Sequence, residues 1–189
     1  MASPVAPTKS RLIVTRGGSA ITSKVPKPVV LVDTREQMPF DLARFSNWLS
    51  GVKTATLDTG DYSIEGMEHL ICLERKSLND LVGTLMHQRG RFFRQLERMQ
   101  AFPYRAILVE ASYAEVKSPY NFTQDVAAHP NGVSGSLDAL EVRFGVPVIY
   151  TSTNRALAEE KAASWLSKTY TYWWLESQGL GRILQEGDL

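Results

Sequence analysis

The sequence has a single cysteine, Cys72, among its 189 residues. One cysteine cannot form an intramolecular disulfide or a cysteine-based metal knuckle, so packing must hold the interior together, as in proteins of reducing compartments. Cys72 stands between Ile71 and Leu73, which favours a buried strand position over a catalytic thiol. The histidines show no spacing typical of metal ligands and are expected at the surface or in loops: His69, His87 and His129.

Long apolar segments are also missing. No run of eighteen apolar residues occurs, and the N-terminus has no charged start followed by an apolar stretch and a cleavage site. We therefore expect a soluble, intracellular protein without a membrane role, cytoplasmic if it comes from a prokaryote or a virus, which we favour, and nuclear if it is eukaryotic. Hydrophobic residues make up 43% of the chain, which is enough for the core of one domain.

The net charge of +1 conceals an uneven distribution. Residues 1–28 contain five basic residues and no acidic one, which leaves 16 basic against 20 acidic residues in the rest of the chain. This segment is rich in Pro, Ser, Thr and Gly and has no amphipathic period, so it predicts a flexible basic tail that could also contact phosphates. Residues 29–178 are predicted to form one folded domain, and residues 179–189 a short C-terminal tail.

From residue 29 onward, strand patterns alternate with helical ones. Short apolar or β-branched runs predict strands at 29–32, 54–57, 62–64, 70–73, 106–109 and 148–150, and the second to fourth of these are expected to form a meander. Helical spacing predicts helices at 41–49, directly after residue 76, at 91–100, around 133–144 and at 155–176. The last helix is expected to pack through one stripe: Ala158, Ala162, Trp165, Thr169 and Tyr172. This order of elements predicts an α/β fold with a mixed central sheet flanked by helices.

One acidic residue precedes the predicted strand 62–64, and another follows the predicted strand 70–73. Asp61 follows Gly60, Glu74 ends the following strand, and a turn at Gly66 would pair the two strands, so the carboxylates can converge on one ion. Lys76 is two positions beyond Glu74, and residues two apart in a strand share a face. Hydrolysis of a phosphodiester needs a nucleophilic water and positive charge at the phosphoryl oxygens, and Mg²⁺ takes few oxygen ligands and keeps several waters. The pattern therefore predicts a Mg²⁺ or Mn²⁺ site with a lysine beside its water.

Two further acids, Asp33 and Glu36, follow the first strand, within plausible reach of that pair. Four carboxylates without a cation would repel one another, so a bound ion would be needed to make the cluster tolerable. The alternative is that these acids are separate caps and salt-bridge partners. The spacing alone leaves both interpretations open.

Three motifs taken together resemble a known family. The strings DTRE (33–36), GDY (60–62) and ERKSLND (74–80) resemble the signature of the XPF/Hef family of structure-specific endonucleases, whose core motif is GD followed by ERK, three residues and D. Three later strings resemble the same nuclease domain in order and spacing: ILVEA (107–111), HPNGVSGSLDAL (129–140) and FGVPVIYTST (144–153). The resemblance covers about residues 29–176 and implies a restriction-endonuclease-like fold.

The resemblance also implies roles for the site residues. Asp61 and Glu74 would bind the metal together with the backbone carbonyl of Arg75, and Lys76 would orient or activate the attacking water. The remaining motif residues would surround this centre.

Asp33 and Glu36 would complete the acidic cluster, and Arg35 and Arg75 would steady the scissile phosphate or the loop. Asp80 would either take part in the chemistry or only cap the helix that starts beside it.

Basic residues concentrate after the proposed site. Residues 74–105 carry seven basic residues against three acidic ones, in a body that is otherwise acidic. We predict that this surface binds DNA phosphates without reading bases. An ordinary solvated helix face is the alternative. The residues expected to contact DNA are Arg35, Arg75, Arg89, Arg91, Arg94 and Arg98.

Larger members of the XPF/Hef family carry a tandem helix-hairpin-helix module after the nuclease domain. Only about a dozen residues follow the last predicted helix here, so we expect that module to be absent. The resemblance implies a homodimer formed through the nuclease domain, to which the aromatic residues of 170–174 would contribute. A base-stacking platform is the alternative use of those aromatic residues.

The sequence as a whole favours a Mg²⁺- or Mn²⁺-dependent DNA endonuclease that cuts one strand near branched, flap or fork junctions. The sequence neither indicates nor excludes a partner protein that targets the nuclease to its DNA. Two alternatives remain: a catalytically silent DNA-binding subunit of a nuclease complex, and a junction resolvase or restriction-like nuclease that shares only the superfamily core. Intact Asp61, Glu74 and Lys76 argue against the silent subunit.

Overall fold

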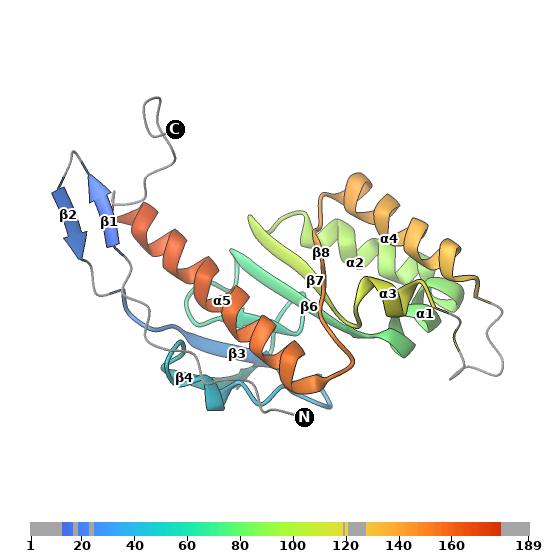
Figure 1. Cartoon of the computed structure of the whole chain (residues 1–189), viewed down its shortest axis with the longest axis horizontal. Coiled ribbons are helices and arrows are strands. Elements are labelled where there is room, and N and C mark those ends of the chain that lie inside the picture. Colours follow the sequence, from blue (N-terminus) through green and yellow to red (C-terminus); the bar gives the residue numbers. More distant parts are fainter. Residues whose placement is uncertain (1–12, 17–18, 23–24, 119, 121–127, 179–189) are drawn as a thin grey trace.

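The structure is a computed structural model that describes residues 13–16, 19–22, 25–118, 120 and 128–178. Its centre is a six-stranded sheet in the order β4-β3-β5-β6-β7-β8, and β1 and β2 form a separate two-stranded sheet (Figure 1). The strands are β1 (Ile13–Arg16), β2 (Ser19–Thr22), β3 (Val29–Asp33), β4 (Gly51–Ala55), β5 (Tyr62–Ile64), β6 (Ile71–Ser77), β7 (Tyr104–Glu110) and β8 (Val148–Tyr150). The helices are α1 (Leu78–His87), α2 (Arg89–Met99), α3 (Tyr113–Val116), α4 (Pro130–Phe144) and α5 (Arg155–Ser177), with a short 3₁₀ turn, η1 (Ala43–Phe45).

The central sheet is mixed, as predicted. β3 is parallel to β4 and antiparallel to β5, and β5 is antiparallel to β6. β6, β7 and β8 are parallel. Residues 106–109 of β7 are fully buried, because a parallel strand inside a sheet is covered on both faces.

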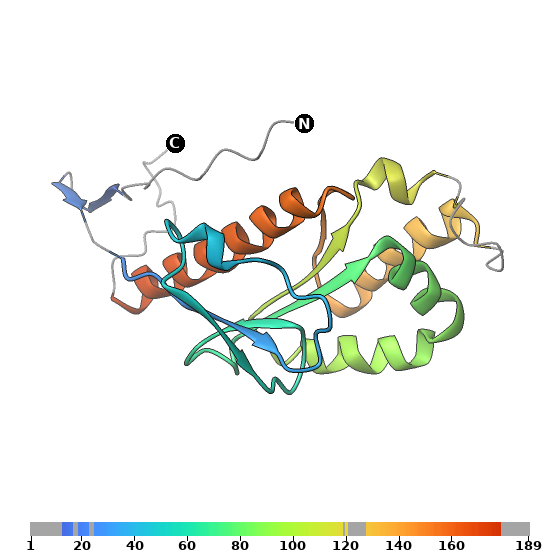
Figure 2. The ribbon, with the colours of Figure 1, turned by 90° about the horizontal axis from the view of Figure 1, so that it is seen from below.

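Helices cover both faces of the sheet. α5 packs on one face, where Ala162 shares a core with Leu73 and Leu108. α1, α2 and α4 pack on the other face, around Cys72 and Val109. We call these the α5 face and the α2 face. Figure 2 shows α5 on one side of the sheet and α1 and α2 on the other, so the predicted architecture is confirmed.

β6 divides its side chains between the two faces. Leu73 belongs to the core of the α5 face and Cys72 to that of the α2 face. Because successive strand residues point to opposite faces, Arg75 follows Leu73 to the α5 face. Glu74 and Lys76 follow Cys72 to the α2 face. The three consecutive residues at the end of β6 therefore serve two different environments.

β6 passes directly into α1, as predicted. The Oγ atom of Ser77 accepts a hydrogen bond from the N–H of Asp80 at 3.1 Å and donates one to its carboxylate at 2.7 Å. The first bond satisfies a free N–H of the first helical turn, and a carboxylate there suits the positive end of the helix dipole. The N-cap itself is Ser77, to which the exposed Asp80 is bound. A part of Asp80 in the chemistry stays a prediction.

The helix predicted at 41–49 is wrong in extent. Only the 3₁₀ turn η1 forms there, although Leu42, Phe45 and Leu49 are buried as the spacing requires. Helices this short are marginal in water, so tertiary contacts decide the conformation. The segment is held by buried Glu159 of α5, which accepts the N–H of Asp41 at 3.0 Å.

The predicted meander is wrong in its first strand. β4 begins and ends earlier than expected, at Gly51–Ala55, and pairs with β3 at the sheet edge rather than with β5. Hydrophobic runs locate strands but do not give their order. Since β3 and β4 are parallel, they need a crossover, which the segment 34–50 supplies.

The predicted N-terminal tail contains regular structure. β1 and β2 are antiparallel and pair Ile13 with Thr22 and Arg16 with Ser19. The signal in the sequence is two short runs with β-branched residues on either side of a Gly-Gly pair at 17–18, a typical hairpin pattern. The predicted C-terminal tail, 179–189, lies outside the described residues.

α5 confirms the helix predicted at 155–176, but the predicted stripe is only partly right. Ala158 and Ala162 are buried, whereas Tyr172 is 59% exposed. Glu159 and Leu166 are buried as well. The side chain of Glu159 turns inward and binds the loop after β3. No helix in the described part of the chain is long and apolar enough to cross a membrane.

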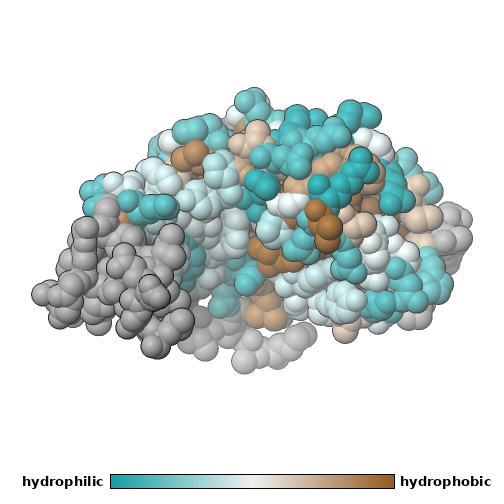
Figure 3. Space-filling model, turned by 90° about the horizontal axis from the view of Figure 1, so that it is seen from above, coloured by the Kyte–Doolittle hydropathy of each residue, from teal (hydrophilic) through white to brown (hydrophobic). Residues whose placement is uncertain are grey.

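Large hydrophobic side chains are exposed at scattered positions rather than in one block. Figure 3 shows a face on which hydrophilic residues predominate and hydrophobic ones form small, separate groups. The most exposed come from several elements and loops: Met38, Met86, Tyr113, Val142, Leu157 and Tyr172.

Candidate active site

Gly60 allows the chain to turn into the site. Its φ is +85°, and a Cβ at this position would lie 2.6 Å from Sγ of Cys72, so no side chain fits. The next residue, Asp61, donates its N–H to the Leu73 carbonyl at 3.0 Å. An oxygen of the Asp61 carboxylate accepts the N–H of Arg75 at 2.7 Å. The carboxylate is thereby fixed against the end of β6.

Asp61 and Glu74 are brought together, as predicted. Glu74 is only 2% exposed. Burial, followed by the charge of the nearby Glu74 carboxylate, raises the pKa of Asp61 to about 7. Glu74 is buried and Asp61 half-buried, and two carboxylates this close would favour a bound cation.

Lys76 and Gln95 hold the two oxygens of Glu74. Nζ of Lys76 lies 2.8 Å from Oε1, and Nε2 of Gln95 donates to Oε2 at 2.5 Å. Burial alone would lower the pKa of the Lys76 ammonium, but the charge of Glu74 raises it above its ordinary value. Lys76 therefore remains a charged donor beside the carboxylates rather than a base.

Arg75 lies on the α5 face and is enclosed by the protein. Its guanidinium binds Glu110 at 2.6 Å, Glu36 at 3.1 Å and the Met38 carbonyl at 2.8 Å. It also lies 4.7 Å from the centre of the Phe40 ring. Since the side chain is only 12% exposed, these contacts favour the loop-steadying role over direct contact with phosphate.

Asp33 organises the loop that follows β3. One of its oxygens accepts the N–H and Nε of Arg35, and the other accepts Nη2 of Arg35 and the N–H of Leu57. The Arg35 side chain foremost, aided by these N–H groups, lowers the pKa of Asp33 to about 2. Arg35 itself is 66% exposed, so it remains open to solvent.

The four acids do not form one cluster. Asp33 is bound to Arg35, and Glu36 to Arg75 on the other face of the sheet. Within the described residues, no group of three or more His, Cys, Asp or Glu side chains is placed to hold a metal ion. The alternative interpretation, salt-bridge partners, describes Asp33 and Glu36. That the pair Asp61 and Glu74 binds a cation stays a prediction.

The arginines of α2 are exposed, as predicted for a phosphate-binding surface. Arg91 and Arg98 lie four residues before and three after Gln95, so they share its side of the helix, and Arg94 lies beside them. We call Arg91, Arg94 and Arg98 the arginine stripe. Arg89 lies elsewhere, over the Phe93 ring at 5.3 Å.

A network that the sequence analysis missed attaches α5 to the site. The side chain of Glu159, 7% exposed, binds Arg155 and Arg44, each at 3.2 Å. Nη2 of Arg155 donates to the carbonyls of Met38 and Pro39, at 2.8 and 2.6 Å. The available signal was an acid, Glu159, on the otherwise apolar face of a helix.

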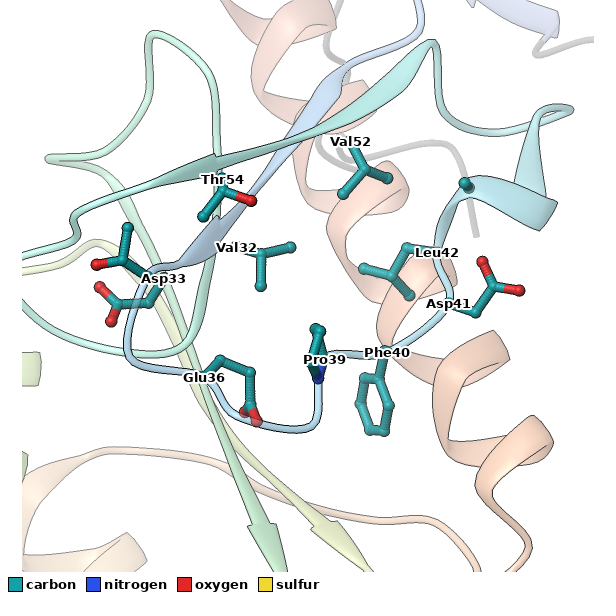
Figure 4. A pocket seen from close by; sticks show the side chains of 11 residues that line it. Val32, Asp33, Glu36, Pro39, Phe40, Asp41, Leu42, Val52 and Thr54 are labelled. Atoms are coloured by element: carbon teal, nitrogen blue, oxygen red, sulfur yellow. The ribbon is translucent and has the colours of Figure 1, made fainter.

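An open hollow lies next to this network, between β3, β4 and the loop 34–43. Figure 4 shows Glu36 and Phe40 on the loop and Val52 and Thr54 on β4, around this hollow. Its volume is about 270 Å³. Asp61 and Glu74 do not line it. The hollow therefore adjoins the carboxylate pair without containing it.

Comparisons with known proteins give the following similarities. A family model described as "ERCC4 domain" matches residues 32–162. The DNA repair protein RAD1 of Saccharomyces cerevisiae is 36% identical over 147 residues, which are 70% of this chain and 12% of that protein. A putative ATP-dependent RNA helicase of Methanocaldococcus jannaschii is 28% identical over 141 residues, 74% of this chain and 15% of that protein. The chain thus spans only a small part of the length of these relatives.

Solved structures give the same picture of the fold. XPF from Aeropyrum pernix superposes with a TM-score of 0.58 at 21% identity, over 80% of this chain and 69% of that one. The same protein in complex with DNA superposes with a TM-score of 0.56 at 20% identity, over 84% of this chain and 68% of that one. The predicted restriction-endonuclease-like fold class, a mixed sheet flanked by helices, is therefore confirmed.

Proposed function

This chain belongs to the ERCC4 domain family, and from that membership we propose that it is a Mg²⁺- or Mn²⁺-dependent DNA endonuclease. It would cut one strand near branched, flap or fork junctions. Two relatives support DNA as the substrate: one is named a DNA repair protein, and the other has been solved in complex with DNA.

The observation that carries the proposal is the close pair of half-buried Asp61 and buried Glu74. The donor set fits a hard divalent cation, because it offers the oxygens of two carboxylates, and hard cations take oxygen ligands. The Arg75 carbonyl is a third candidate. Its N–H binds Asp61, and the N–H and C=O of one strand residue point to the same side. A bound Mg²⁺ or Mn²⁺ would supply positive charge for the phosphoryl oxygens and a reactive water.

The chain's own residues would position the attacking water, the loop beside the site and the DNA. The protonated Lys76, beside Glu74, would orient the attacking water or a phosphate oxygen through its N–H donors. Arg75 would keep the loop 36–40 and the end of β6 in register through its bonds to Glu36 and Glu110. The exposed arginine stripe would hold the DNA backbone next to the carboxylates. We also propose that two chains act as a homodimer.

The test is cleavage of labelled flap, fork, four-way and linear DNA with Mg²⁺, Mn²⁺ or a chelator. Wild-type protein should nick one strand of the flap or fork when metal is present and nothing in chelator. Glu74→Gln and Lys76→Met should each lose at least two orders of magnitude in rate, roughly the effect of removing one electrostatic donor from an active site.

The control is Glu65→Gln, which removes another carboxylate bound to a lysine, Lys53, at 2.5 Å, but at an exposed place. It should cut like wild type. DNA binding without cutting by the wild type under all metal conditions would instead favour the silent DNA-binding subunit.

A further inference from the structure

One contact to Glu74 comes from a helix rather than from the motif that contains it. Gln95, in the middle of α2, donates its amide Nε2 to Oε2 of Glu74 at 2.5 Å. Lys76 occupies the other oxygen, Oε1, at 2.8 Å. Each oxygen of this buried carboxylate thus has its own donor.

The position of Gln95 is fixed by the packing of its helix. Phe92, Leu96 and Met99 on α2 are all buried against the α2 face of the sheet. These residues immobilise the backbone on either side of Gln95, so the amide is presented to Glu74 from a rigid element. Donors on rigid elements orient a carboxylate more accurately than donors on loops.

The chemistry of an amide suits this position. A carboxamide donates a hydrogen bond without adding positive charge to that of the Lys76 ammonium on the other oxygen, so it does not itself neutralise Glu74. A lysine or arginine in its place would compete with the cation for the same carboxylate. Partners of this kind, which orient a ligand without touching the metal, commonly govern metal affinity.

We propose that Gln95 is a positioning residue that orients the Glu74 carboxylate for a divalent cation. The inference rests on the proposed function, because it assumes that Glu74 binds that cation. Gln95 itself acts only through Glu74, not on the DNA.

The test replaces Gln95 with a side chain of similar length that has no donor, Gln95→Met. Binding of Mn²⁺ to the full chain is measured without DNA by electron paramagnetic resonance of the free ion. The dissociation constant should rise about ten- to hundredfold, the usual effect of losing such a partner. Cleavage should then need a higher Mn²⁺ concentration to reach half its maximal rate, with a smaller loss at saturating Mn²⁺.

The chain offers a matched control directly after the same helix, at its C-cap. Gln100 also donates its Nε2 across the fold, to the Phe144 carbonyl at 3.1 Å, away from Glu74. Gln100→Met loses the same chemical group and should bind Mn²⁺ like wild type. Thermal unfolding of both variants without metal reports any general loss of stability.

The outcomes separate the two claims. Unchanged Mn²⁺ affinity in Gln95→Met, with tight binding by the wild type, overturns this inference and leaves the proposed function standing. Equal weakening in Gln95→Met and Gln100→Met also overturns it, since the effect would then be one of stability. If the wild type binds no Mn²⁺, both claims fail.

Discussion

At the scale of single residues, three neighbours at the end of β6 work in two different environments. Glu74 and Lys76 meet Asp61 on the α2 face, whereas Arg75 meets Glu36 and Glu110 on the α5 face. The motif is compact in sequence because a strand alternates its side chains, and one short segment can therefore build the ion site and steady the loop behind it.

The pair Asp61 and Glu74 predicts an unusual pH dependence of stability without metal. The folded pKa of Asp61, about 7, is above the ordinary value of 3.8. The raised pKa stabilises the folded protein when Asp61 is protonated. This stabilisation is fully present below about pH 4 and is lost as the pH rises through 7, and it amounts to about 1.4 kcal/mol for each unit by which the folded pKa exceeds the unfolded one. The side chain at this position in Asp61→Asn cannot titrate. The free energy of unfolding of the variant should therefore exceed that of the wild type at pH 8, and this excess should be smaller at pH 5.

The measurement is urea unfolding in chelator at both pH values. Asp58→Asn, which changes an exposed acid three residues upstream, is the control and should follow the wild type. If wild type and Asp61→Asn lose or gain stability in parallel from pH 5 to pH 8, the carboxylates are not coupled as described.

Much of this residue-level picture could be predicted from the sequence. Strand alternation and the turn at Gly66 were enough to bring Asp61, Glu74 and Lys76 together. The partners of Asp33 and Glu36 could not be predicted, because they depend on which arginine reaches which carboxylate. The contact of Gln95 with Glu74 could not be predicted either, since nothing in a helical period shows which strand residue a helix will touch.

At the scale of elements, α5 is connected to the loop after β3. Arg155 and Glu159 begin this helix and bind the backbone of residues 38, 39 and 41. The Met38 carbonyl also accepts Nη1 of Arg75. The first turns of α5 therefore support the same loop as Arg75 does.

We predict that Glu159→Gln destabilises the fold by about 2 kcal/mol. Removing one partner leaves two guanidinium groups without their carboxylate, an effect that is larger for fully buried pairs. Hydrogen exchange should also accelerate at the Asp41 amide. Glu176→Gln, an exposed change on the same helix, should do neither. Unchanged exchange at Asp41 in Glu159→Gln would show that the loop does not depend on α5.

The arginine stripe of α2 makes a second prediction at this scale. Arg91→Gln and Arg98→Gln should each weaken DNA binding and reduce the slope of log affinity against log salt by about 1, as expected for the loss of one phosphate contact. Arg89→Gln, on the side of Phe93, should have a smaller effect on both. Binding is measured by fluorescence anisotropy in Ca²⁺ or chelator. Equal losses in all three variants would mean that the stripe is not the contact surface.

Helices and strands differ in how well the sequence reveals them. α1 and α4 have side-chain caps. α2 lacks one but has an apolar period whose residues Phe92, Leu96 and Met99 are buried. The 41–49 segment has the same period but too few residues for a stable helix, and the contact with Glu159 decides its shape. The inward turn of Glu159 likewise shifts the buried face of α5, which spacing alone does not reveal.

At the scale of the whole molecule, one mixed sheet separates two cores and carries the carboxylate pair near its middle. The sequence predicts the class of this fold but not the strand order, because β4 reaches β3 by a crossover that no local pattern records. The superposition on XPF from Aeropyrum pernix supports the same fold independently. The sheet then explains why residues from three separate segments meet: Asp61, Glu74 and Lys76 of β6, and Gln95 of α2.

The most direct test of the central claim is the anomalous scattering of Mn²⁺ in crystals of the protein. The account predicts a peak on the α2 face within bonding distance of both Asp61 and Glu74, and its loss in Glu74→Gln crystals. A peak bound instead by Asp33 and Glu36 at the hollow, or no peak at saturating Mn²⁺, would contradict it.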